Sequence, residues 1–453
     1  MSKESNNPAI SRIESLLDPN SFVELGALVT ARSTDFNTDT KQLASDGVVA
    51  GHGLIDGKLV FVYSQDPSVL NGTIGEMHAR KIVSIYEKAM KMGAPVIGIL
   101  DCAGIRLMES VDALEALGSV YTAVSDASGV VPTITAVYGN CGGGLSVLAA
   151  LSDFVYMEKD AKLYLNSPDA ISGSRKDKLD TSAADYQAEC GNASFVGTED
   201  EIAAAIRGLI DILPSNNMDD YVADECDDDL NRATEGLDAN KLDAVYVTTE
   251  IADGRRFVEI KKNYAADMIT GFIQLDGITV GVVGNGADEL TADGCEKAAD
   301  FVKFCDAYDL PILSLTNVAS YDASVDGEKR LTRSLARLAA AFTEADTAKI
   351  NLITGSAVGT GYLFMNSKAL GADLVFAYDD CKVQAIDPAV AAKVMNIDAF
   401  EYEEKMTGAA SAARRGYIDR ILTTADTRKY IIAGFEMLLS KRDDYSYRKH
   451  STK

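Results

Sequence analysis

A run of glycines follows a short apolar segment in the first part of the chain. It reads Tyr138-Gly139-Asn140-Cys141-Gly142-Gly143-Gly144-Leu145-Ser146. Glycines that end a strand and open a helix leave backbone N–H groups without partners, and such groups bind an anion or a developing oxyanion. A close contact between helix and strand is the alternative, because it also requires small residues. A P-loop is excluded, since no Gly-Lys-Ser/Thr follows.

A second glycine-containing segment has the same position relative to a later apolar strand. It reads Ala357-Val358-Gly359-Thr360-Gly361-Tyr362 and follows the expected strand 350–353. Two segments of this kind favour the functional interpretation. They indicate two oxyanion sites and therefore two ligands that contain a carbonyl group.

Two further segments in the first part of the chain have residues suited to ligand binding. One is Asp101-Cys102-Ala103-Gly104-Ile105-Arg106, which leaves an expected strand; an ordinary turn with an Asp–Arg pair is the alternative. The other, residues 72–81, opens a helix with Gly75, His78, Arg80 and Lys81. These cations could hold a phosphate, or the segment could be an exposed helix start. For His78, packing is favoured over a role as catalytic base.

The composition excludes several classes of protein. The net charge of −25 argues against nucleic acid and anionic membranes as main partners, while 47% hydrophobic residues indicate a folded protein. Three histidines leave little material for a metal site or a Ser-His-Asp triad. Seven cysteines without a Cys-x-x-Cys pair predict a reduced, cytosolic protein. We expect no signal peptide, because residues 1–10 have no basic segment followed by an apolar stretch. We expect no membrane-spanning segment, because no apolar run approaches about 18 residues.

An internal repeat organises the chain. Matching segments keep the same order in the two halves, which predicts two homologous domains, 1–235 and 236–453. The pairs are Phe22–Leu25 with Phe257–Ile260, Gly51–Gly57 with Gly271–Gly277, Lys81 with Lys297, Pro95–Ile97 with Pro311–Leu313, Gly143 with Gly359, and Asp153–Val155 with Asp373–Val375.

Each half has the same expected order of elements. A hairpin with an Asp-Gly turn, at Asp56-Gly57 or Asp276-Gly277, precedes a helix expected over 74–92 or 295–308. Buried strands then alternate with helices, which predicts an α/β fold with a largely parallel sheet. The acidic segment 219–229 between the halves is interpreted as a solvated connector, with a calcium loop as the weaker alternative.

Taken together, the motifs resemble the carboxyltransferase subunits of biotin-dependent acyl-CoA carboxylases and decarboxylases, a family that includes propionyl-CoA carboxylase β chains and methylmalonyl-CoA decarboxylase α chains. The resemblance covers residues 12–442. The segments that carry it are 12–18 with 21–25, 46–49, 61–66, 75–82, 93–98, 128–132, 213–217, 365–368 with 370–375, and 415–419.

The resemblance implies two tandem crotonase-like (ClpP-like) domains, with acyl-CoA bound by residues 1–235 and biotin by residues 236–453. It implies that the backbone at Gly143, Gly144, Gly104 and Ile105 faces the thioester oxygen of the acyl-CoA. The backbone at Gly359, Thr360 and Gly361 would face the ureido oxygen of biotin. Gly75, His78, Arg80, Lys81 and Arg106 are expected on the CoA side, and no metal is expected.

The implied function is carboxyl transfer between carrier-bound biotin and a short acyl-CoA of the propionyl or methylmalonyl type. The implied partners are a biotin carrier protein, a biotin carboxylase or a membrane decarboxylase subunit, and further copies of the chain. At least a dimer is expected, and hexamers are common in the family. A cytoplasmic location is expected, with membrane association only through partner subunits.

The second half departs from the family pattern. Asn317-Val318-Ala319-Ser320-Tyr321 replaces Asp-Val-Pro-Gly-Phe, and Thr360 replaces the second glycine of a Gly-Gly pair. Threonine keeps the backbone amide, but its side chain narrows the approach to it. Two alternatives therefore stay open. One is a degenerate CoA-binding subunit that pairs with an intact relative, and the other is a crotonase-type acyl-CoA hydrolase or decarboxylase that does not use biotin.

Overall fold

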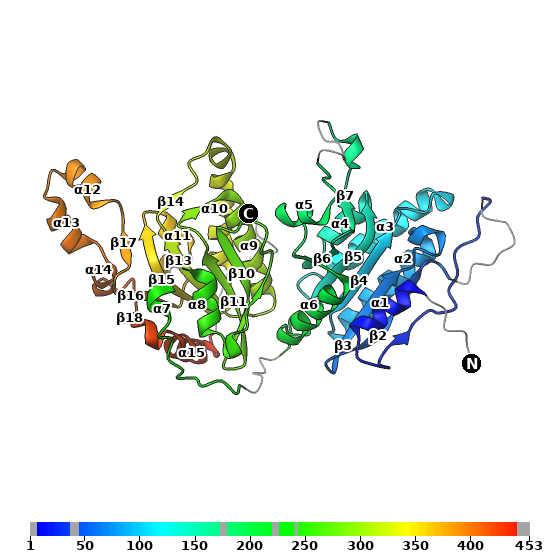
Figure 1. Ribbon diagram of the computed structural model, residues 1–453, viewed down its shortest axis with the longest axis horizontal. Helices are drawn as coiled ribbons and strands as arrows, with labels where there is room; N and C mark the ends of the chain where they lie inside the picture. The colour runs from blue at the N-terminus through cyan, green and yellow to red at the C-terminus, as the bar shows by residue number, and fades with distance from the viewer. Residues whose placement is uncertain (1–6, 37–44, 173–178, 220–225, 241–242, 442–453) are drawn as a thin grey trace. The chain divides into compact units, whose positions relative to one another are not determined.

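The chain forms two compact units, Met1–Asp219 and Asp220–Lys453, and each is described by itself. The computed structural model describes residues 7–36, 45–172, 179–219, 226–240 and 243–441 (Figure 1). The division differs from the boundary expected after residue 235, because residues 226–235 pack with the second unit. There the Thr234 N–H donates to the Ala425 carbonyl at 3.1 Å, and Arg428 Nε donates to the Asp229 carbonyl at 3.3 Å.

The first unit is built around one mixed sheet. Strands β1, β2 and β3 pair antiparallel, and the following strands are parallel, in the order β1-β2-β3-β4-β5-β6-β8 with β7 paired to β5. The strands are β1 Val23–Glu24, β2 Val48–Ile55, β3 Lys58–Gln65, β4 Val96–Cys102, β5 Thr133–Gly142, β6 Phe154–Glu158, β7 Lys162–Tyr164 and β8 Phe195–Gly197; the helices are α1 Pro8–Leu16, α2 Glu76–Met92, α3 Val111–Ala127, α4 Gly144–Ala150, α5 Ala184–Glu189 and α6 Glu199–Ile212.

Helices cover both faces of this sheet. Helices α2 and α3 lie side by side on one face, and α1 and α6 lie against the other (Figure 1). Alternate strand residues face opposite sides. Val96 and Leu100 of β4 accordingly join the core under α2 and α3, together with Ile82 and Val120 of those helices. Both faces of the parallel strands are therefore buried, which holds the carboxyl ends of β4 and β5 in fixed positions.

The second unit repeats this plan. Its sheet has the order β18-β16-β15-β13-β11-β10-β9, β17 pairs with β15, and β12 pairs with β14 in a separate small sheet. The strands are β9 Val258–Glu259, β10 Met268–Leu275, β11 Ile278–Asn285, β12 Glu289–Leu290, β13 Ile312–Val318, β14 Ser320–Tyr321, β15 Lys349–Val358, β16 Leu374–Tyr378, β17 Lys382–Gln384 and β18 Arg420–Leu422; the helices are α7 Leu237–Asn240, α8 Ala244–Ile251, α9 Ala292–Ala307, α10 Val325–Glu344, α11 Gly361–Phe364, α12 Pro388–Met395, α13 Ala399–Met406, α14 Ala409–Arg414 and α15 Thr427–Leu438.

The expected α/β class and the two related halves are confirmed. Both Asp-Gly hairpin turns form, with φ of 48° and 81° at Asp56 and Gly57, and 53° and 72° at Asp276 and Gly277. Such positive values at both central residues are those of a type I′ turn. The helices expected over 74–92 and 295–308 are α2 and α9.

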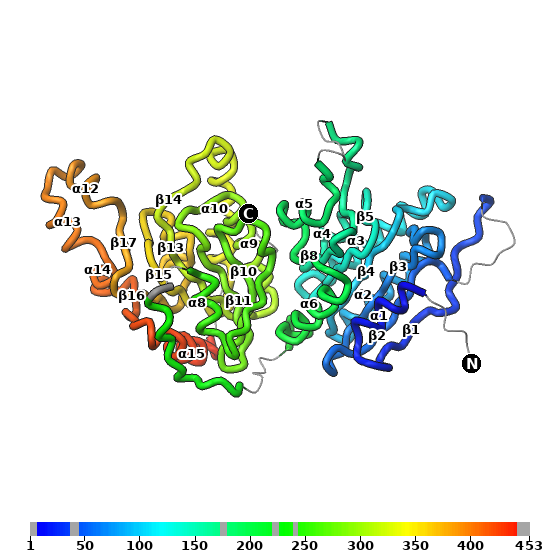
Figure 2. Tube along the Cα trace, in the orientation of Figure 1, coloured from blue at the N-terminus to red at the C-terminus, as the bar shows by residue number. Residues whose placement is uncertain are grey.

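One segment of the second unit stands away from its sheet. Helices α12 and α13 pack on each other and extend outward beyond β17, as the Cα trace follows (Figure 2). Val394 and Phe400 on these helices are exposed. Within the described residues, every helix is too short or too polar to cross a membrane.

Candidate active site

The candidate site of the first unit lies where β4 and β5 end. The pairing of these parallel strands shifts after Leu100, at a bulge, and ends with Cys102 opposite Cys141. Ile105 and Gly144 each follow three residues after this pair. The register therefore brings the two glycine-containing segments that the sequence singled out to the same edge of the sheet.

The Ile105 backbone points an N–H group away from the neighbouring chain segment. Ile74 N donates to the Gly104 carbonyl at 3.0 Å, and Arg106 N donates to the Ile74 carbonyl at 2.7 Å. In this parallel arrangement Ile74 uses both of its backbone groups, and those of Ile105 face the opposite side. The Ile105 N–H is therefore available to a ligand.

The Gly143 N–H is already used within the fold. It donates to the Tyr164 carbonyl of β7 at 2.9 Å. Gly144 follows as the first residue of α4, where backbone N–H groups lack helical partners. The expectation that Gly143 and Gly144 both offer amides is therefore corrected. Gly144 has an open amide, and Gly143 supplies the positive φ of 62° that turns the chain into the helix.

The second unit reproduces this geometry at its equivalent residues. Val318 pairs with Ala357 at the ends of β13 and β15, and Tyr321 and Thr360 each follow three residues later. Asp322 N donates to the Leu290 carbonyl at 3.0 Å, so the Tyr321 N–H faces away from β12 just as that of Ile105 faces away from Ile74.

Gly359 is the equivalent of Gly143 and has the same use. Its N–H donates to the Gln384 carbonyl of β17 at 2.9 Å, and its φ is 61°. The available amide is therefore that of Thr360, which corrects the expectation for Gly359. Gly361 has a steric role, since a Cβ there would lie 2.6 Å from Val318 Cγ1.

Gly104 also differs from its expected role as an amide donor. Its N–H donates to Cys102 Sγ at 3.3 Å, and its carbonyl accepts from Ile74 N. Its φ of 118° is one that favours glycine. Gly104 therefore shapes the turn that presents the Ile105 amide.

Two of the three cations expected to hold phosphate, Lys81 and Arg106, form a buried cluster with Asp46 and Glu109 instead. Arg106 Nη1 pairs with Glu109 Oε1 at 3.1 Å, while Nη2 donates to the Thr73 carbonyl at 2.6 Å and to the Asp46 carbonyl at 2.8 Å. Lys81 Nζ donates to the Val48 carbonyl at 2.5 Å and lies 3.5 Å from Asp46 Oδ1. Arg106 and Lys81 are 2% and 8% exposed, so neither side chain is free to take a phosphate.

The buried cluster anchors the start of α2 beside the site. Glu109 Oε2 accepts from Glu76 N at 2.6 Å, at the first turn of that helix. Gly75 precedes it as a close-approach residue, because a Cβ there would lie 2.4 Å from Glu109 Oε1. Arg106 is the direct neighbour of Ile105, so its contacts fix the segment that carries the Ile105 amide.

His78 is fully buried within the same region. Its Nδ1 lies 3.2 Å from the Asp46 carbonyl and its Nε2 lies 3.3 Å from Gln65 Nε2. These contacts fit a neutral ring that donates from Nδ1 and accepts at Nε2. Burial, and then the nearby Arg106, lower the pKa of His78 to about 3. His78 is therefore a packing residue and not a base, as the sequence favoured.

The depressed pKa of His78 predicts acid sensitivity of the fold. Below a pH of about 6.5 the unfolded chain binds a proton at this histidine, and the folded chain does not until about pH 3. The free energy of unfolding should therefore fall as the pH drops through that window, by at most about 1.4 kcal/mol per pH unit from this group. Urea unfolding at several pH values should give a shallower fall for His78→Gln. An equal fall in both proteins would contradict this.

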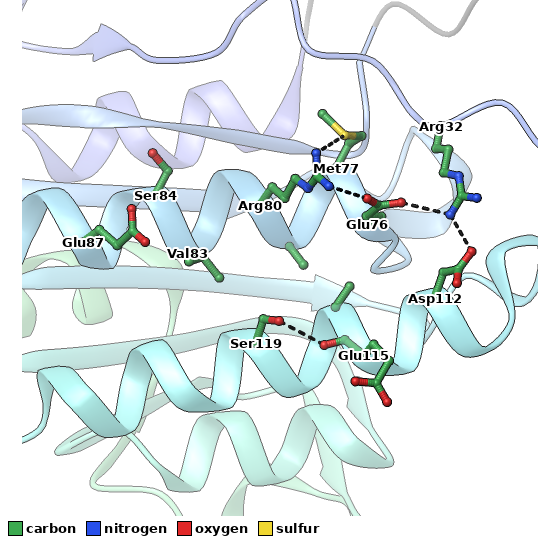
Figure 3. A pocket seen from close by; sticks show the side chains of 12 residues that line it. Arg32, Glu76, Met77, Arg80, Val83, Ser84, Glu87, Asp112, Glu115 and Ser119 are labelled. Carbon is green, nitrogen blue, oxygen red and sulfur yellow. Dashed lines mark hydrogen bonds and ion pairs between the residues drawn. The ribbon is translucent and has the colours of Figure 1, made fainter.

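Arg80 is the exposed cation of the expected set. It lies in a cleft of about 920 Å³ between α2 and α3, which Figure 3 shows. Its Nη2 pairs with Glu76 Oε1 at 2.6 Å, and Glu76 Oε2 pairs with Arg32 Nη1 at 2.9 Å. Much of the positive charge at this cleft is therefore balanced by carboxylates.

The thiols at the strand ends, Cys102 and Cys141, are buried. Burial raises the pKa of Cys102 to about 11 and raises that of Cys141 as well, so both are protonated at neutral pH. Within the described residues no group of three or more His, Cys, Asp or Glu side chains is arranged to hold a metal ion. The strand ends nevertheless offer open backbone amides to a ligand.

Several residues that the sequence analysis did not single out support these amides. Gln65 Oε1 accepts from Asp101 N at 3.1 Å, and in the second unit Asn285 Oδ1 accepts from Asn317 N at 2.9 Å. Tyr121 Oη donates to the Gly144 carbonyl at 2.6 Å and orients that residue. Gln65 and Asn285 end equivalent strands of the repeat, a signal that alignment of the two halves could have found.

Comparison with known proteins places the chain among carboxyltransferases. The family model described as "Carboxyl transferase domain" matches residues 2–452. The chain belongs to the carboxyl transferase family. It is 35% identical over 467 residues to the methylmalonyl-CoA decarboxylase subunit alpha of Veillonella parvula, covering 98% of this chain and 92% of the relative. It is 34% identical over 478 residues to the mitochondrial propionyl-CoA carboxylase beta chain of Sus scrofa, covering 98% and 87%.

A solved structure agrees with this assignment. The transcarboxylase 12S hexamer with hydrolysed methylmalonyl-coenzyme A bound matches with a TM-score of 0.93 and 32% identity, covering 98% of this chain and 92% of the other. These matches confirm the expected family, the crotonase-like fold of both halves and a carboxyltransferase activity. The two alternative functions are not favoured. In this carboxyltransferase, the open backbone amides lie at the carboxyl ends of β4 and β5 and of β13 and β15.

Proposed function

We propose that this carboxyltransferase moves a carboxyl group between biotin on a carrier protein and a short acyl-CoA of the propionyl or methylmalonyl type. The observation that carries the proposal is the repeated pair of open backbone amides, Ile105 with Gly144 and Tyr321 with Thr360. Two such pairs suit a reaction with two carbonyl-containing partners. The names of the relatives and the bound ligand of the solved neighbour support the acyl-CoA class.

In the first unit, the Ile105 and Gly144 amides would stabilise negative charge on the thioester oxygen. That charge develops when the α-carbon loses its carboxyl group or its proton. Amides held by strands and a helix are aimed before the reaction begins, so little reorganisation is needed. Because the thiols are protonated and His78 is neutral, the chain acts through these donors.

In the second unit, the Tyr321 and Thr360 amides would face the ureido oxygen of biotin. Biotin, when bound, supplies the ureido nitrogen that carries or accepts the carboxyl group. The amides would orient the ring and favour the form with more negative charge on oxygen. The carboxyl ends of β13 and β15 suit this role because the amides there have the same backbone arrangement as those at the ends of β4 and β5.

Exposed cations near α2 could balance the phosphates of CoA. Arg80 and Lys88 line a hollow of about 360 Å³ together with the apolar side chains of Leu25, Val29 and Met77. Arg80 is retained from the expected cation set, whereas Lys81 and Arg106 serve the fold. A cationic rim beside apolar side chains fits an amphiphilic ligand of this class.

The proposed partners follow from the two ligands. Biotin must arrive on a carrier protein, and a biotin carboxylase or a membrane decarboxylase subunit would supply or remove its carboxyl group. We propose at least a dimer of this chain. The solved transcarboxylase neighbour is a hexamer, which supports assembly of several copies.

An assay of decarboxylation tests the proposed function. The purified chain would be mixed with malonyl-CoA or methylmalonyl-CoA, with and without free biotin, and loss of the carboxylated thioester followed by chromatography. We expect turnover that depends on biotin. Thioester binding without turnover would contradict the proposal in favour of a degenerate subunit, and turnover independent of biotin would contradict it in favour of a crotonase-type enzyme.

A further inference from the structure

Two hydroxyl groups meet at the candidate site of the second unit. Tyr321 Oη and Thr360 Oγ1 lie 2.7 Å apart, which is a hydrogen-bond distance between hydroxyls. Tyr321 ends β14, and Thr360 precedes α11. They are also the two residues whose open amides were described at this site. A side-chain contact therefore joins the two backbone donors of one site.

The first unit has no such pair. The residues equivalent to Tyr321 and Thr360 are Ile105 and Gly144, neither of which has a polar side chain. The backbone arrangement is shared by the two units, as the registers of Cys102 with Cys141 and Val318 with Ala357 indicate. The two sites therefore differ in the hydroxyl groups and not in the backbone amides.

Counting the protons of the pair leaves one donor free. Each hydroxyl has one hydrogen, and one of them donates to the other oxygen. Within the described residues, neither oxygen has a second hydrogen-bond partner, and Thr360 is exposed. Burial is the main cause that raises the pKa of Tyr321, so its hydroxyl stays protonated at neutral pH. The remaining hydrogen is available to a ligand.

When Tyr321 donates to Thr360, the free hydrogen is that of the Thr360 hydroxyl, beside the open amide of the same residue. Covalent geometry holds a threonine Oγ1 within about 3.7 Å of its own backbone nitrogen, whatever the rotamer. An oxygen that accepts from the Thr360 N–H is consequently within reach of the Thr360 hydroxyl. The hydrogen bond to Tyr321 fixes the position of that hydroxyl, which reduces the entropy lost on binding.

We propose that the Tyr321–Thr360 hydroxyl pair donates a hydrogen bond to the ureido oxygen of biotin, in addition to the two backbone amides. Thr360 is the residue that touches the ligand, and Tyr321 positions it. This inference rests on the proposed function. It assigns the second unit a side-chain binding element, where the sequence suggested only that threonine narrows the approach.

Steady-state kinetics with free biotin as the varied substrate tests this assignment. Malonyl-CoA is held at saturation, and the variants are Thr360→Ala, Thr360→Ser and Tyr321→Phe. We expect kcat/KM for biotin to fall roughly tenfold in Thr360→Ala and several-fold in Tyr321→Phe, as for loss of a neutral hydrogen bond. Thr360→Ser keeps the hydroxyl and should stay within about twofold of the unaltered protein.

Two controls separate this effect from general damage. Tyr430→Phe removes a tyrosine hydroxyl on α15 of the same unit and should leave kcat/KM for biotin unchanged. The KM for malonyl-CoA should be unchanged in every variant, since that ligand is assigned to the first unit. A variant that loses both parameters together would point to misfolding, and circular dichroism would then exclude it from the comparison.

Three results would contradict the assignment of the Tyr321–Thr360 hydroxyl pair. Unchanged kcat/KM for biotin in Thr360→Ala and Tyr321→Phe would overturn the hydroxyl assignment and leave the proposed function standing. A rise in that parameter would also overturn it, because the pair would then obstruct the ligand. Absence of biotin-dependent turnover in the unaltered protein would overturn both.

Discussion

Gly144→Pro should abolish most of the turnover while leaving the protein folded. Proline lacks the backbone N–H that Gly144 is proposed to aim at the thioester oxygen, and loss of one such donor typically lowers kcat by about a hundred- to a thousandfold. Gly144 is the first residue of α4, a position where proline is favoured. The substitution therefore removes a hydrogen-bond donor without breaking the helix. The measurement is kcat for biotin-dependent decarboxylation of malonyl-CoA.

Gly144→Ala is the matched control for this variant. A Cβ at residue 144 would lie 2.7 Å from Tyr121 Oη, so alanine and proline displace that side chain alike. Alanine keeps the N–H, and its kcat should stay within about tenfold of the unaltered value. Equal activities of the alanine and proline variants would contradict the oxyanion role of Gly144.

The neighbouring glycine would not serve this purpose. Gly143 has a φ of 62°, which proline cannot adopt, and its N–H donates to the Tyr164 carbonyl. Gly143→Pro would therefore disturb the pairing of the segment with β7 and test folding as much as catalysis. Gly144→Pro, and not Gly143→Pro, is therefore the substitution that tests the oxyanion role.

Arg106→Met should cause the largest loss of stability. The substitution leaves the Glu109 carboxylate buried without its cation, removes the Arg106 donor from the Thr73 carbonyl, and leaves the Asp46 carbonyl with His78 alone. Breaking a buried ion pair in this way costs about 3–5 kcal/mol. Urea unfolding of the full chain should shift to a lower midpoint, with the first unit, which contains the buried cluster, unfolding earlier.

Arg80→Met provides the comparison for this experiment. Arg80 is also paired with a carboxylate, but its side chain is 67% exposed and its partner Glu76 lies one helical turn away. An exposed pair of this kind contributes about 0.3–0.5 kcal/mol. The two variants should consequently differ by several kcal/mol in the free energy of unfolding. A loss below about 1 kcal/mol for Arg106→Met would contradict the structural role of the buried cluster.

Periodicity and turn chemistry predicted the framework well. The Asp56-Gly57 and Asp276-Gly277 turns and the two amphipathic helices depend on residues close in the sequence, so their patterns are local. The repeat then extended each local pattern to the other half. The strand ends that carry the candidate sites were found for the same reason.

The roles of individual groups at the site depended on residues far apart in the chain. The Tyr164 carbonyl accepts a hydrogen bond from the Gly143 N–H, and the Gln384 carbonyl accepts one from the Gly359 N–H. Both carbonyls belong to short strands, β7 and β17, that have no clear sequence pattern. Arg106 and Lys81 seemed suited to phosphate because cations are usually exposed. Asp46 and Glu109 reverse that expectation by giving them buried partners. Glu109 is only three residues from Arg106, whereas the fold is needed to bring Asp46 to both cations.

The main-chain anchoring of Gly143 and Gly359 bears on how the two halves could diverge. A contact between an N–H group and a carbonyl is indifferent to the side chains of the residues that make it. Mutations could therefore accumulate in the flanking loops during evolution without displacing the Gly144 and Thr360 amides. Low sequence similarity between the halves is thus compatible with inherited geometry.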